Sequence, residues 1–140
     1  MALRHVNVVE RVFGLSNRCA AGDADALVEL ETAYHNDVRF ESLIPEAREL
    51  QSGSAAIREY FEQVVPSYAE WQVELDYVQD YGETVLALGA LRASQPGDAS
   101  QERAVGWIFA FREDKIDAVT AYPSYGDALR AATMRHVKTP

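Results

Sequence analysis

Cysteine and histidine are scarce in this chain, whose 140 residues include one cysteine and three histidines. The single thiol of Cys19 excludes an internal disulfide, and three scattered histidines give no ligand cluster for a metal ion. We therefore expect no metal and no other cofactor, and we expect a reducing compartment such as the cytoplasm.

A cluster of positive charge and a long apolar stretch are also missing. The 13 lysines and arginines are dispersed along a chain of net charge −9, which would repel a phosphate backbone. No apolar run is long enough to span a bilayer, and residues 1–5 lead into no apolar segment of a secretion signal. The isolated glycines form no phosphate-binding loop. The sequence thus predicts no nucleic acid and no membrane as partners.

Apolar residues recur at helical spacing in several stretches, and 48% of the chain is hydrophobic. The predicted helices run from Val6 to near Gly22, from an Asp23 N-cap to near Tyr34, from residues 52–54 to Pro66, and through a short final stretch at Ala128–Ala132. The polar run Tyr34–Asn36 indicates a turn, and residues 133–140 are expected to fray.

Alternation with period two, or a continuous apolar run between turns, indicates strands elsewhere. The predicted strands are Asp37–Ser42, Trp71–Tyr77, Thr84–Ala93, Arg103–Phe111 and Ile116–Tyr122. Turn residues at 95–98 and 113–115 make the later strands antiparallel neighbours. The pattern predicts one α+β domain, in which helices on one face of a strongly curved antiparallel sheet form a cone-shaped cup.

Short motifs follow one another in a set order. They are Ala21-Gly22-Asp23 with Ala26-Leu27-Val28, Asp37-Val38-Arg39-Phe40, Gly53 with Ala56-Ile57-Arg58-Glu59-Tyr60-Phe61, Trp107-Ile108-Phe109, and Ala121-Tyr122 with Asp127-Ala128-Leu129. In these motifs the chain resembles the SnoaL-like branch of the nuclear transport factor 2-like superfamily, over nearly its whole length. The resemblance implies a cystatin-like cup and a single SnoaL-like domain over residues 1–132.

The superfamily includes ketosteroid isomerase, polyketide cyclases and epoxide hydrolases as well as members without chemistry. The catalytic groups of ketosteroid isomerase fall on Ser42, Leu15 and Trp107 of this chain, none of which is a matching acid or phenol. The last-strand aspartate of the epoxide hydrolase falls on Ala121. The resemblance therefore implies neither of these two activities, and we expect no ketosteroid isomerase activity.

The strand faces suggest which side chains line the cup. The candidate ligand-binding residues are Val38, Phe40, Ser42, Phe61, Trp107, Phe109, Val119 and Ala121. For most of these apolar residues, plain core packing is the competing interpretation. Trp107 is favoured as a wall of the site because a buried indole needs a partner for its N–H. Trp71 is placed near the entrance of its strand, away from the ligand.

The candidate catalytic residues are Asp117, Tyr60 and Arg103. By alternation Asp117 shares a face with Val119, where burial would raise the pKa of its carboxyl and suit it to acid–base chemistry. Tyr60 would bring a hydroxyl, and Arg103 would lie at the mouth of the cup. The competing interpretations are a turn-end carboxylate, a core tyrosine and a solvated arginine.

Two classes of function remain open at this point. One is a cofactor-independent isomerase, cyclase, lyase or hydrolase that acts on a small hydrophobic molecule. The other is a non-catalytic module that binds such a ligand or a partner protein. A homodimer through the outer face of the sheet is also expected, since the runs Thr84–Ala93 and Ala104–Ala110 would leave apolar residues on that face.

Overall fold

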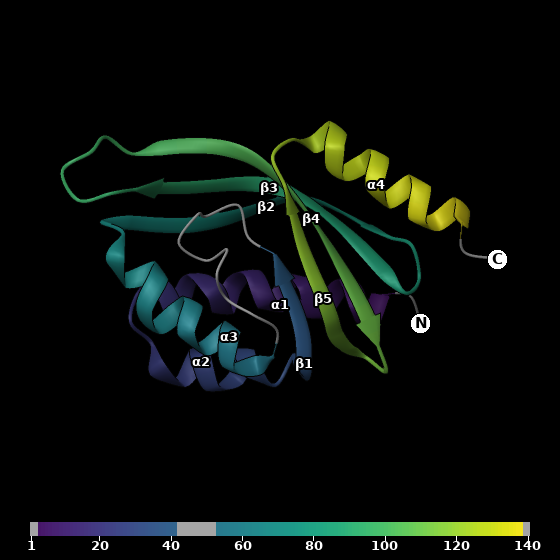
Figure 1. Ribbon diagram of the computed structural model, residues 1–140, viewed down its shortest axis with the longest axis horizontal. Coiled ribbons are helices and arrows are strands. Elements are labelled where there is room, and N and C mark those ends of the chain that lie inside the picture. Colours follow the sequence, from purple (N-terminus) through teal and green to yellow (C-terminus); the bar gives the residue numbers. More distant parts are fainter. Residues whose placement is uncertain (1–2, 42–52, 139–140) are drawn as a thin grey trace.

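The computed structural model describes residues 3–41 and 53–138. Its elements are α1 Leu3–Ala20, α2 Ala24–Glu31, β1 Tyr34–Glu41, α3 Ser54–Glu59, β2 Glu70–Asp80, β3 Thr84–Ser94, β4 Gln101–Arg112, β5 Lys115–Tyr122 and α4 Tyr125–Lys138. After α3 the chain continues as a π-helical turn η2, Tyr60–Val64, and a 3-10 turn η3, Val65–Ser67. Figure 1 shows α1, α2 and α3 on one side of the sheet and α4 on the other.

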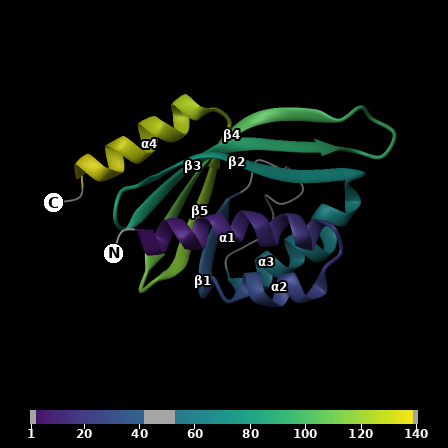
Figure 2. The same cartoon turned by 180° about the vertical axis from the view of Figure 1, so that it is seen from behind.

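The sheet has the strand order β1-β5-β4-β3-β2. The pairs formed by β2, β3, β4 and β5 are antiparallel, as predicted, whereas β1 joins β5 in parallel. Figure 2 shows α1 along the inner side of this sheet, with α2 and α3 next to it. The predicted α+β cup is therefore confirmed, with a mixed sheet in place of a purely antiparallel one.

The junction of α1 and α2 follows the sequence signals closely. Gly22 has a φ of 95°, a left-handed conformation that glycine adopts at low cost, and its N–H donates to the Cys19 carbonyl at 3.0 Å. The Asp23 carboxylate then accepts from the backbone N–H of Ala26 at 3.1 Å as the N-cap of α2. This turn fixes the two helices side by side against the sheet.

The strand β1 begins three residues earlier than predicted. Tyr34–Asn36 was expected to be a turn, but Tyr34 pairs with Ile116, whose N–H donates to the Ala33 carbonyl at 2.8 Å. Pairing with β5 gives hydrogen-bond partners to backbone N–H and C=O groups of this polar stretch, which in a turn would be hydrogen-bonded to water. Ser42 and the predicted loop from Leu43 to Gln51 lie outside the described residues.

The outer face of the sheet is covered by α4, which is longer than predicted and extends to Lys138 into the stretch expected to fray. Ala128 and Ala132 of α4 pack on Leu86 and Ile108, and all four are buried. A methyl group at Gly106 would lie 2.2 Å from Cβ of Ala128, so only glycine allows this close approach. The expectation that this outer apolar face is bare within one chain is thus wrong at the positions beneath α4.

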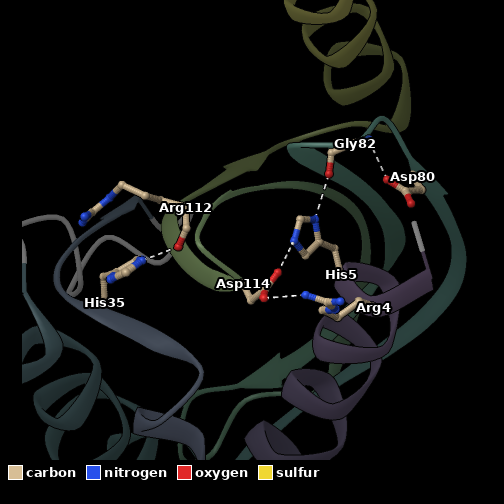
Figure 3. A network of polar contacts seen from close by, with 7 residues as sticks. All are labelled: Arg4, His5, His35, Asp80, Gly82, Arg112 and Asp114. Carbon is tan, nitrogen blue, oxygen red and sulfur yellow. Dashed lines mark hydrogen bonds and ion pairs between the residues drawn. The ribbon is translucent and has the colours of Figure 1, made fainter. Parts of the chain in front are cut away.

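Polar contacts anchor the first turn of α1 to two strand turns. Figure 3 shows His5 between the Gly82 carbonyl, 2.8 Å from Nδ1, and the Asp114 carboxylate, 3.3 Å from Nε2. Arg4 Nη1 donates to the same carboxylate at 2.6 Å. The His5 ring also stacks on Phe111, with ring centroids 4.1 Å apart. These contacts close one end of the cup.

Candidate functional site

A cavity of about 70 Å³ lies between the inner helices and the sheet. A buried water needs roughly 10–15 Å³ on this scale, so the space is several waters in size. It is lined by Val12, Phe13, Ser16, Tyr34, Ile57, Tyr60, Phe61, Trp71, Val73, Trp107, Phe109, Val119 and Ala121.

A second cavity of about 40 Å³ adjoins the first. The two share the lining residues Tyr60, Trp71, Val73, Trp107 and Ala121. The second adds Leu91 and Val105, from the segments of β3 and β4 that lead into the hairpin between them. The space inside the cup is therefore elongated toward the hairpin, and the residues that line only this end are apolar.

Aromatic rings form two clusters in the lining of the cavities. In one cluster Trp71 of β2 meets Phe61 and Tyr60 edge to face, with centroids 5.7 and 6.2 Å apart. In the other cluster Phe13 of α1 meets Trp107 of β4 edge to face at 4.9 Å. Edge-to-face packing fixes the orientation of the rings in each cluster.

The π-helical turn explains how consecutive aromatic residues can face one cavity. In η2 the N–H of Val65 donates to the carbonyl of Tyr60, five residues back. The extra residue in this turn rotates the helix, so Tyr60 and Phe61 are both buried and both line the cavity. Turns of this kind are frequent at functional sites.

Hydroxyl groups supply the polarity of the larger cavity. The residues Ser16 and Tyr34 are 7% and 6% exposed and line the cavity, and no hydrogen bond of either side chain is found within the described parts of the chain. Burial raises the pKa of the Tyr34 phenol far above its ordinary value, which keeps this hydroxyl protonated. No Asp, Glu, His, Lys or Arg is among the described residues that line either cavity.

The indole nitrogen of Trp71 is a further unpaired donor. Its Nε1 is buried and has no acceptor among residues 3–41 and 53–138. Unpaired buried donors are rare in folded proteins, and they concentrate where function requires them.

Several predicted site residues do come together on the cavity wall. They are Tyr60, Phe61, Trp107, Phe109, Val119 and Ala121. Their contact with a ligand stays a prediction. Val38 is fully buried in the inner core but does not line the cavity. The backbone of Phe40 pairs with Val119, whereas its side chain, like Ser42, lies outside what the structure describes.

Asp117 does not face the cup, contrary to the alternation argument. Ile116 pairs with Phe111 and Ala118 with Ala110, so Asp117 is the extra residue of a β-bulge. Its carboxylate instead accepts from Arg112, 3.2 Å from Nη2 and 3.3 Å from Nε. A surface ion pair replaces the proposed catalytic acid.

Arg103 lies on the cup side of β4 but remains exposed. It pairs with Leu91, which lines the smaller cavity, yet Arg103 itself lines neither space. The guanidinium is therefore outside the cavity, at its hairpin end.

The sequence interpretation missed several lining residues. Trp71, assigned to a strand entrance, lines both cavities together with Val73 of the same strand face. Its alternation with Val73 was a usable signal, since both side chains point to one face of β2. The helical spacing of Val12, Phe13 and Ser16 likewise marked the inner face of α1. Tyr34 carried no such signal because its segment was taken as a turn.

The described residues contain no group of three or more His, Cys, Asp or Glu side chains that could hold a metal ion. None of their helices is long and apolar enough to cross a membrane.

Solved structures with the same fold are numerous. An NTF2-like protein of unknown function from Burkholderia pseudomallei has a TM-score of 0.72 and 16% identity, over 91% of this chain and 95% of that chain. A candidate polyketide cyclase from Xanthomonas campestris has a TM-score of 0.68 and 19% identity, over 90% and 94%. TerC, co-crystallised with polyporic acid, has a TM-score of 0.66 and 13% identity, over 97% and 99%. At these identities the likeness shows the fold alone.

The sequence matches none of the curated proteins with which it was compared. The model of one family, the SnoaL-like domain, matches residues 9–119. This match spans most of the chain, and the structures that resemble the protein share its nuclear transport factor 2-like fold. The protein therefore belongs to the SnoaL-like family, and its fold is that of nuclear transport factor 2-like proteins.

Proposed function

We propose that the protein binds a small, mainly apolar organic molecule inside its cup. The observation that carries this proposal is the pair of adjoining cavities lined by two aromatic clusters, one containing Trp71 and the other containing Trp107. Apolar walls supply affinity at about 25 cal/mol for each Å² removed from water, and a few polar groups orient the ligand. That TerC was co-crystallised with polyporic acid supports the choice of an organic molecule as the occupant.

Binding is favoured over acid–base catalysis by the chemistry of the lining. General acid–base catalysis needs a group that gains and loses a proton near the working pH. Among the described lining residues the titratable side chains are Tyr34 and Tyr60, and the phenol of Tyr34 is held in its protonated form. Asp117 is paired with Arg112, and Arg103 lies outside the cavity.

A cofactor-independent isomerase, cyclase or hydrolase is the second candidate. The candidate cyclase of Xanthomonas campestris has the same fold, and this likeness supports the second candidate. In that case a tyrosine hydroxyl of the cavity would donate a proton or a hydrogen bond to a substrate oxygen. The cytoplasm remains the proposed compartment and a homodimer the proposed assembly, both on the sequence arguments given above.

The proposal is tested by titrating the protein with indane, an uncharged bicyclic hydrocarbon, in a calorimeter. Wild-type protein should bind indane saturably. Ala121→Leu fills the cavity from β5 and should weaken binding by about tenfold or more, since little burial is left for the probe. Ala104→Leu makes the same change at an exposed position of β4 and should bind like wild type. Equal affinity in both variants would place indane elsewhere and reject the cup as its site.

A further inference from the structure

We propose that Ser16 and Tyr34 form an oxygen-recognition site inside the cup, which selects an uncharged ligand bearing a carbonyl or hydroxyl oxygen. This inference rests on the proposed function, because it concerns the chemistry of the same occupant. Its starting point is that both residues line the larger cavity and that no hydrogen bond of either side chain is found within the described residues.

A buried hydroxyl without a partner needs an explanation. Leaving a buried donor unpaired is unfavourable, so such groups are almost always paired with protein or water. Ser16 and Tyr34 are each more than nine-tenths buried, and the space beside them is large enough for a polar atom. A ligand oxygen in that space would accept the hydrogen bonds that the folded chain does not supply.

The state of Tyr34 suits a donor. Burial raises the pKa of its phenol, with the Cys19 thiol and the Tyr60 phenol acting in the same direction. The hydroxyl therefore keeps its proton at neutral pH, and a carbonyl or hydroxyl oxygen is the complementary acceptor.

The lack of charge in the lining argues for an uncharged ligand. Burying an ionised carboxylate is unfavourable unless a cation is paired with it. No Lys, Arg or His is among the described residues that line the cavity. Hydroxyl donors without a nearby cation can pair with an uncharged oxygen, but they cannot balance the charge of a carboxylate.

The larger cavity has two hydroxyl-bearing residues that the smaller one lacks, and this difference sets the orientation of the ligand. Ser16 and Tyr34 line the larger cavity, whereas the residues added by the smaller one are Leu91 and Val105. The oxygen would lie toward Tyr34, and the apolar body would pass Trp71 and Trp107 toward the hairpin of β3 and β4. This arrangement distinguishes a ketone or phenol from a plain hydrocarbon of the same shape.

The test compares 1-indanone with indane, which differ by one carbonyl oxygen. The measured quantity is the ratio of their affinities, determined by calorimetry for wild type, Tyr34→Phe and Ser16→Ala. Each variant should lower the ratio of the affinity for 1-indanone to the affinity for indane by about fivefold, the value of one net hydrogen bond. Tyr77→Phe removes an exposed hydroxyl of β2 and should keep the wild-type ratio.

The outcomes separate this inference from the proposed function. If indane binds and the ratio is the same in wild type and in both cavity variants, the oxygen-recognition site is rejected and the cup still binds apolar molecules. If neither compound binds wild-type protein, both proposals fail. Thermal melts guard against misfolding, because removal of an unpaired hydroxyl should leave Tyr34→Phe at least as stable as wild type.

Discussion

Asn17 and Val73 exchange two hydrogen bonds: Asn17 Nδ2 donates to the Val73 carbonyl and the Val73 N–H donates to Asn17 Oδ1, each at 2.8 Å. Val73 belongs to β2, the last strand of the sheet, and among the described residues no strand pairs with the outer edge of β2. The amide of Asn17 thus takes the place of a strand and holds α1 against this edge. Ser16, the neighbour of Asn17 in α1, lines the larger cavity, and so does Val73 itself.

Asn17→Ala should destabilise the protein by about 2–3 kcal/mol. The change removes two hydrogen bonds and leaves a partly buried N–H and carbonyl of Val73 unpaired. Urea unfolding measures the effect. The control is Asn7→Ala at an exposed position of the same helix, for which we expect a change within about 0.5 kcal/mol. Equal effects of the two substitutions would show that the contact contributes nothing.

Gly106→Ala should destabilise the protein by roughly 1–3 kcal/mol, because the added methyl group overlaps Cβ of Ala128. Ala128→Gly opens the missing space at the cost of a helical glycine of about 1 kcal/mol. The double variant should therefore be more stable than the sum of the two single effects predicts. Strict additivity in a denaturant-unfolding cycle would mean that α4 does not lie against β4 in solution.

The stability of the junction between α1 and α2 should depend on acid pH through Asp23. The hydrogen bond from Arg18, followed by that from the Ala26 N–H, lowers the pKa of this carboxyl below its ordinary value of 3.8. A lowered folded-state pKa means that its stabilisation is complete above about pH 4 and is lost as the pH falls through the folded value.

Asp23→Asn keeps a capping side chain but removes the charge, so its melting temperature should lie below that of wild type at pH 7 and approach it at pH 2–3. The matched control is Asp25→Asn in the first turn of the same helix, which removes a carboxylate without breaking the Arg18 pair. A gap between wild type and Asp23→Asn that persists unchanged at low pH would contradict this origin of the stabilisation.

A homodimer through the outer face of the sheet stays a prediction, now with different contact residues. Leu86 and Ile108 are covered by α4 of the same chain, so a partner would have to meet exposed side chains such as Leu129 and Tyr77. Sedimentation equilibrium at micromolar concentration should give twice the 15.6 kDa mass of the chain. Leu129→Glu should shift this equilibrium toward the monomer, whereas Val28→Glu on α2 should not. A single 15.6 kDa species for wild type would refute the dimer.

The fold was predictable because its signals are local. The Gly22 and Asp23 boundary, the helical spacing of α1 and the alternation of β4 each follow from a few neighbouring residues. The site was less predictable because faces depend on register. One extra residue at Asp117 reverses the alternation that was used to place it, and pairing partners alone reveal the bulge.

The remaining differences between the predicted and the observed elements result from contacts between residues far apart in the sequence. Tyr34 belongs to the sheet because it pairs with β5, and nothing in the polar run Tyr34–Asn36 indicates that partner. The length of α4 depends on a patch of Leu86 and Ile108 that sits far away in the sequence. Local propensity is overridden in such places by burial.

The central claim, that the cup holds a small organic molecule against its two aromatic clusters, is tested most directly by fluorine NMR. The chain has two tryptophans, so labelling with 5-fluorotryptophan gives one resonance for Trp71 and one for Trp107, assigned with the Trp71→Phe and Trp107→Phe variants. Both side chains line both cavities, and titration with indane should therefore shift both resonances along saturable curves with a common dissociation constant. Two resonances that stay unchanged up to the solubility limit of indane, in protein that remains folded, would contradict the claim.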